Sequence, residues 1–148
     1  MPRRNKQKES YIQRISNKAF FSEEIVNKLT FSFKYFRSGN KAGESFEEWE
    51  KDQILADLNN KLKHYSNLGK RELIMSSILE LFDAFPPDSE FDEPLDLQEY
   101  AIRWARLTIT GKRRLIGFFF NDENSENVFY IVFLDKEHRF APSYKKHT

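Results

Sequence analysis

The chain has 148 residues, of which 39% are apolar, 16% aromatic and 32% charged, and its formal net charge is +1. This length suits one domain, and fifteen Phe residues provide enough apolar material for a core, which excludes wholesale disorder. No apolar run approaches the roughly 20 residues that cross a bilayer, and no secretory-signal pattern follows the basic N-terminus. The absence of Cys excludes a disulfide framework and a thiolate zinc site. We therefore expect a cytoplasmic protein without a membrane partner.

The first predicted elements lie before residue 37. Residues 1–28 are expected to form a basic arm and short helices, ahead of a domain over residues 29–148. Apolar and polar side chains then alternate from Leu29 to Phe36, as is typical of a half-buried strand.

Two helices are predicted next. Ser45 followed by Glu48 forms a capping-box pattern, which predicts the start of a helix over residues 45–67. Apolar residues at a spacing near 3.6 continue along it and along a second predicted helix, residues 71–85, which Pro86 and Pro87 would end.

Residues 100–140 are strand-like, with turns at "TGK" and "NDENSEN". The predicted fold class is therefore α+β: an antiparallel sheet of about four strands, including residues 29–36, packed against a two-helix hairpin, with an extra N-terminal helical segment. One shared core is expected to bury the following residues: Trp49, Leu55, Leu58, Ile78, Phe82, Leu115, Phe119, Phe129, Ile131 and Phe133.

The small net charge hides a segregation along the chain. Residues 44–99 contain fifteen acidic and five basic side chains, a net charge of −10, which leaves +11 for the remainder. This asymmetry predicts either an anion-binding surface or simply acidic helix faces and basic tails.

The basic residues near the strand ends are the strongest candidates for chemistry. Lys112, Arg113 and Arg114 open one predicted strand, and Lys136, His138 and Arg139 follow the next, so an antiparallel hairpin would place them at one end of the sheet. Arginine binds phosphate in a bidentate manner, lysine supplies a point charge, and histidine or tyrosine can exchange a proton. This inventory suits RNA binding or metal-free RNA cleavage; solvated hairpin ends are the alternative. The expected RNA-binding residues are Arg103, Arg106, Lys112, Arg113, Lys136, Arg139, Lys145 and Lys146.

Other kinds of site lack their sequence patterns. His64, His138 and His147 are far apart and form no metal-binding motif, so no metal is expected. The phosphate-binding glycine loops and the nucleophile-elbow motif are also missing, and no cofactor is expected.

The segment "WARLTITGKRRLIGFFF…NVFYIVFLDKEHRFAPSY" resembles the C-terminal half of the RelE/ParE toxin superfamily. The expected order of a strand, a helical hairpin and further strands is similar to that superfamily's β-α-α-β-β-β order. The combination "FSFKYF…SFEEW…FPP…FYIVFLD…KKHT" also resembles a group of uncharacterised bacterial proteins.

The superfamily resemblance implies specific roles. Arg114 matches a strand arginine that contacts the scissile phosphate, His138 a second basic residue, and Tyr144 a C-terminal tyrosine active in proton transfer. The implied function is a toxin of a toxin–antitoxin or phage-defence system, an mRNA endonuclease with metal-independent chemistry. Its partners would be RNA or the ribosome, and a cognate antitoxin or other protein. Alternatives are a non-catalytic protein-interaction module or defence-system accessory of the same fold, and a gyrase-poisoning toxin that needs neither His138 nor Tyr144.

Overall fold

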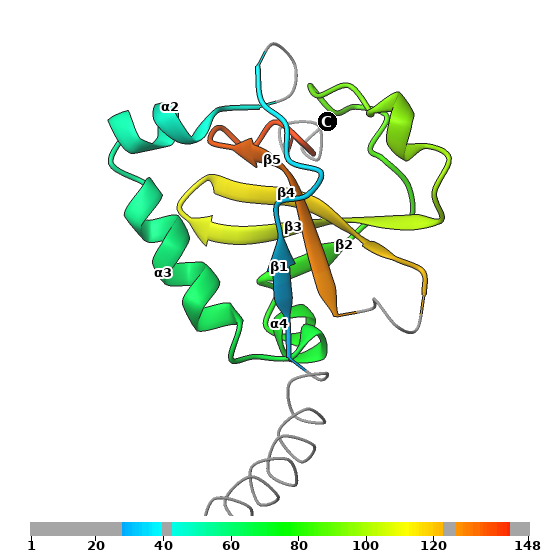
Figure 1. Cartoon of the computed structure of the whole chain (residues 1–148), viewed down its shortest axis with the longest axis horizontal. Helices are drawn as coiled ribbons and strands as arrows, with labels where there is room; N and C mark the ends of the chain where they lie inside the picture. The colour runs from blue at the N-terminus through cyan, green and yellow to red at the C-terminus, as the bar shows by residue number, and fades with distance from the viewer. Residues whose placement is uncertain (1–27, 40–42, 123–126, 143–148) are drawn as a thin grey trace, which may run out of the picture.

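A five-stranded mixed sheet forms the centre of the described part of the chain (Figure 1). The structure is a computed structural model that describes residues 28–39, 43–122 and 127–142. Its elements, in chain order, are β1 (Thr30–Ser32), α2 (Phe46–Lys51), α3 (Leu55–Tyr65), α4 (Lys70–Met75), β2 (Leu79–Leu81), the 3₁₀ helix η1 (Leu95–Leu97), β3 (Ile102–Thr110), β4 (Arg113–Phe120) and β5 (Val128–Asp135). The predicted N-terminal arm and short helices lie outside the described residues.

The strands follow the order β1-β5-β4-β3-β2. β2 to β5 form antiparallel pairs, whereas β1 runs parallel to β5, with Phe31 beside Phe129. The α+β class is therefore confirmed, but the fully antiparallel sheet of about four strands is wrong. Two parallel strands need a long connection between them, and the chain from α2 to β4 connects β1 to β5.

The predicted helix over residues 45–67 is two helices. Its start is confirmed by two hydrogen bonds. The Glu48 amide donates to Ser45 Oγ at 3.2 Å, and the Ser45 amide donates to the Glu48 carboxylate at 3.4 Å. The helix ends at Lys51, and Gln53 takes the left-handed conformation (φ 62°) before α3 begins. This turn allows α2 and α3 to bury Trp49 and Leu58 in one core.

The predicted helix over residues 71–85 is also wrong beyond its first turns. α4 ends at Met75, Ser77 has φ 63°, and β2 follows. Backbone bonds to β3 fix this strand: the Thr108 amide donates to the Ile78 carbonyl and the Phe82 amide to the Trp104 carbonyl, both at 2.9 Å. A short apolar run such as this fits either periodicity, and pairing with β3 decides it.

The two faces of the sheet carry separate cores. One core joins the sheet to α2, α3 and α4, and the other is an aromatic cluster beneath the 82–100 connection and Phe140. Of the ten residues expected to be buried, Leu55, Ile78 and Phe82 are only partly buried. The prediction of one shared core is wrong, because Phe133 lies in the second core. The confirmed buried residues are Trp49, Leu58, Leu115, Phe119, Phe129, Ile131 and Phe133.

A bulge between β4 and β5 sets the strand register near the candidate site. The pairing shifts between Ile116 and Gly117, so Ile116 faces Phe133 while Gly117 faces Ile131. A Cβ atom at Gly117 would lie 2.1 Å from the Tyr130 carbonyl oxygen, and only glycine fits there. Beyond the bulge, Arg114 pairs with Asp135.

Candidate functional site

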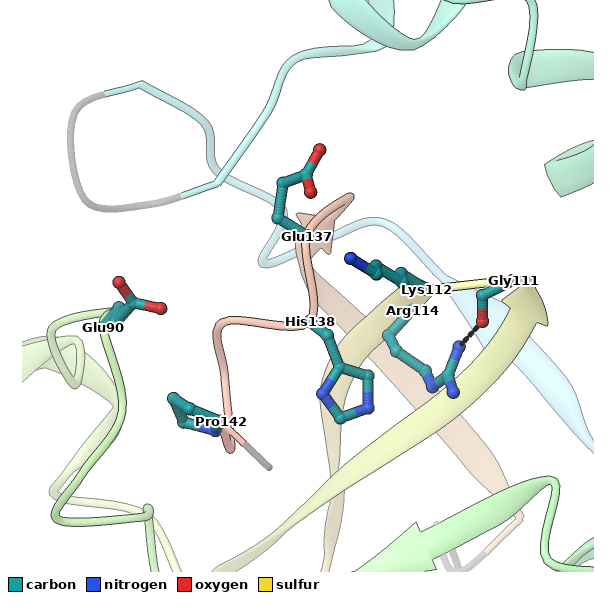
Figure 2. Close-up of a pocket in the computed structure, with 7 residues that line it drawn as sticks. All are labelled: Glu90, Gly111, Lys112, Arg114, Glu137, His138 and Pro142. Carbon is teal, nitrogen blue, oxygen red and sulfur yellow. Dashed lines mark hydrogen bonds between the residues drawn. The ribbon is translucent and has the colours of Figure 1, made fainter. Parts of the chain in front are cut away.

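The two basic clusters lie at the same end of the sheet, as the hairpin geometry predicted. Arg114 near the start of β4 pairs with Asp135 at the end of β5, and the 136–140 loop follows directly. A depression of about 350 Å³ opens there, and Figure 2 shows the residues around it. The lining residues are Glu90, Gly111, Lys112, Arg114, Glu137, His138 and Pro142.

The Arg114 guanidinium is held by the β3–β4 turn. Its Nη1 donates to the Gly111 carbonyl at 2.6 Å, drawn in Figure 2, and to the Arg113 carbonyl at 3.0 Å. Among the described residues, no carboxylate forms an ion pair with it. Burial, together with the nearby charge of Arg106, lowers the pKa of Arg114. A partly desolvated cation without a carboxylate partner is suited to binding an oxyanion.

His138 reaches the depression from the loop after β5. Its backbone is left-handed (φ 60°), a conformation uncommon for residues other than glycine. Burial is the main cause that lowers the pKa of its imidazole, and the positive charges of Arg106 and Arg114 lower that pKa further. Its ordinary pKa is about 6.5, so the lowered value favours a neutral imidazole at neutral pH, which can accept a proton.

Asp135 fixes the loop that carries His138. This carboxylate is fully buried, and its two oxygens accept the Arg139 and Phe140 amides, each at 2.9 Å. Burial raises the pKa of Asp135, and the two amide hydrogen bonds oppose that rise.

Glu44 fixes the same loop from the other side. Its buried carboxylate accepts hydrogen bonds from Trp49 Nε1 at 3.0 Å, from the Lys136 amide, and from Arg139 Nη2 at 3.0 Å. The start of α2 is thereby tied to the loop after β5. Sequence reasoning missed both acids; an acid ending an apolar strand, as in "FLDKEH", was the available signal for Asp135.

Four of the other expected RNA-binding cations are paired with carboxylates inside the protein. Arg103 contacts Asp83 at 3.2 Å, Arg106 contacts Glu80, Lys136 contacts Asp52 at 2.8 Å, and Arg139 contacts Glu44 at 3.0 Å. Arg106 also donates to the Ala141 carbonyl at 3.2 Å. These pairings leave less positive charge for an external anion than the sequence suggested.

The remaining expected site residues divide into three groups. Lys112 lines the depression together with Arg114 and His138. Arg113 is partly buried and does not line it; its Nε has no hydrogen-bond partner among the described residues. Tyr144, Lys145 and Lys146 lie outside the described residues.

The described ranges contain no group of three or more side chains able to hold a metal ion. No helix in those ranges is long and apolar enough to cross a membrane. Comparison of the chain with family models, with curated proteins and with solved structures found no match. We therefore infer the function from the geometry and chemistry of the depression.

Proposed function

We propose that this chain is a metal-independent endoribonuclease that acts at the Arg114–His138 depression. The observation that carries the proposal is that these two residues, 24 positions apart in the sequence, line the same depression. One is a cation without a carboxylate partner in the described part of the chain, and the other is a histidine whose pKa is lowered. Cleavage of RNA without a metal needs both properties.

In the proposed reaction, Arg114 and Lys112 bind the non-bridging oxygens of the scissile phosphate. The neutral imidazole of His138 takes the proton of the adjacent 2′-hydroxyl, and the 2′-oxygen attacks phosphorus. A bond from O2′ to phosphorus forms while the bond from phosphorus to O5′ breaks, which gives a 2′,3′-cyclic phosphate. O5′ leaves with a proton from Tyr144 or from water. Arg114 stabilises the negative charge that grows on the phosphate oxygens.

The proposed biological role is that of a RelE/ParE-like toxin that cleaves mRNA, with the ribosome and an antitoxin as partners. The order of one strand, helices and an antiparallel run of strands supports this role, since the superfamily resemblance implies a similar order. The break between α2 and α3 and the strand β2 depart from the arrangement expected from the sequence.

A second candidate is a non-catalytic protein-interaction module. The acidic residues Glu90 and Glu137 also line the depression, and their charges oppose the approach of a phosphate. Basic groups of a protein partner would meet these carboxylates favourably.

Induced expression in a bacterial host separates the two candidates. Growth arrest with cleaved transcripts is expected for the wild type, and Arg114→Ala and His138→Ala should each abolish both effects while staying folded. Arg71→Ala is the matched control, because Arg71 is an exposed cation of α4 that does not line the depression. Intact transcripts and normal growth at a good yield of folded wild-type protein would contradict the ribonuclease and favour the interaction module.

A further inference from the structure

β2 is an edge strand with backbone groups available for pairing. It stands at the end of the strand order, so only β3 pairs with it in the described part of the chain. The backbones of Ile78 and Phe82 form hydrogen bonds with β3. Glu80, midway between these two residues, lies opposite Arg106. Hydrogen bonding alternates along an antiparallel ladder, so the amides and carbonyls of Leu79 and Leu81 point to the open edge.

An apolar groove runs beside this edge. It has a volume of about 460 Å³ and lies between α4 and β2, with Arg103 of β3 at its wall. Ile74 near the end of α4 lines the groove and is 38% exposed, while the neighbouring Met75 is 77% exposed but does not line it. Apolar side chains gathered next to free strand groups are typical of a surface that binds an extended peptide.

Glu80 pairs with Arg106 through Oε2, but its side chain is still 48% exposed, so its carboxylate also affects which strand can pair there. If a second copy of this chain paired through β2 with Glu80 at the centre, two glutamates would lie opposite each other, and like charges directly opposite are destabilising. A strand with a basic residue at that position would meet Glu80 favourably. Its two flanking residues would point to the sheet face on which Leu79 and Leu81 join the helices, where apolar side chains fit.

We propose that the β2 edge binds an extended segment of a different polypeptide, which adds a strand to the sheet. The segment has an apolar–basic–apolar pattern: its Lys or Arg faces Glu80, and its apolar side chains fill the groove beside Ile74 and Leu79. This inference does not depend on the proposed ribonuclease, because none of the residues that line the groove lines the Arg114–His138 depression.

Selection of a random peptide library on the full-length chain tests the proposal. Enriched peptides should carry an apolar–basic–apolar core, and replacing the basic residue of a synthesised peptide with Glu should weaken its binding. Ile74→Glu should weaken binding about tenfold, the effect of losing one buried apolar side chain. Leu95→Glu is the matched control, since Leu95 is an exposed apolar residue (82%) on η1 that does not line the groove.

Amide hydrogen exchange shows where the selected peptide binds. Bound peptide should slow exchange at the Leu79 and Leu81 amides, which point to the open edge, more than at Leu115 in the interior of the sheet. Three outcomes would overturn the proposal: no enrichment, peptides that bind Ile74→Glu as tightly as the wild type, or peptide-free dimers in which the same two amides are protected. The third outcome would assign the edge to a second copy of the chain.

Discussion

At the scale of single residues, the site depends on how His138 is held. Its left-handed backbone follows β5 in a loop closed by Asp135, and its ring shares a depression with Arg114. Hairpin geometry was enough to predict that these two residues share one end of the sheet. The support from Glu44 was not predictable, because a sequence does not distinguish a buried acid that accepts hydrogen bonds from a solvated one.

The titration of His138 is the first prediction. Burial, Arg106 and Arg114 lower its pKa, and Glu80 opposes them, so the full-length protein should show a value below the ordinary value of about 6.5. Arg114→Ala removes one of the two cations, so it should move the pKa upward, whereas Arg71→Ala should leave it unchanged. NMR of the imidazole C–H signal measures this, with His138→Gln identifying the resonance.

The same shift has a consequence for stability. Between the lowered pKa and about 6.5, the unfolded chain binds the His138 proton more readily than the folded protein, so the free energy of unfolding should rise with pH across that interval. A His138 pKa at or above 6.5 in the folded protein would contradict both the shift and the role of a neutral base.

At the scale of elements, the sequence predicted the features that depend on residues close together in the chain. The capping box at Ser45 predicted the start of α2, and the aromatic runs predicted β4 and β5. The break at Gln53 and the change from α4 to β2 were not predictable, because both follow from packing and pairing with distant strands. The parallel direction of β1 has the same origin.

The 136–140 loop gives a prediction at this scale. Asp135→Asn keeps the side-chain shape but removes one of two acceptors, leaving the Arg139 or Phe140 amide without its bond. Leaving one buried amide unsatisfied costs about 1–3 kcal/mol, so the free energy of unfolding in urea should fall by that amount. Asp83→Asn is the control, since the Asp83 side chain is 99% exposed, and should change it by less than about 0.5 kcal/mol. Equal stabilities would show that Asp135 does not hold the loop.

At the scale of the whole molecule, part of the charge segregation reflects internal pairing. Among the described residues, five ion pairs each join an acid of residues 44–99 to a base outside that range. The acids are Glu44, Asp52, Glu80, Asp83 and Asp96, and the bases are Arg139, Lys136, Arg106, Arg103 and Arg37. The composition showed two oppositely charged sets but could not show that they meet each other in the fold.

This pairing predicts a modest salt dependence of RNA binding. With Lys112 and Arg114 as the phosphate contacts, the logarithm of the binding constant should fall with the logarithm of salt concentration with a slope of about −1.4, at about −0.7 per contact on a single strand. If Arg114 and all eight expected RNA-binding cations made contacts, the slope would be about −6.3. Fluorescence anisotropy with a 2′-O-methyl RNA, which cannot be cleaved by the proposed reaction, measures this slope. A flat response would argue against phosphate contacts and for a protein partner.

The proposed paired action of Arg114 and His138 on RNA is tested most directly by analysing the ends of cleaved RNA. Purified full-length protein, an RNA oligonucleotide and a chelator should yield 2′,3′-cyclic phosphate ends, and a single 2′-deoxy substitution at the cleavage site should block the reaction. Arg114→Ala/His138→Ala should slow cleavage by at least about 10²-fold, the usual effect of losing a proton-transfer group. Cleavage at the wild-type rate by the folded double variant would contradict the assignment.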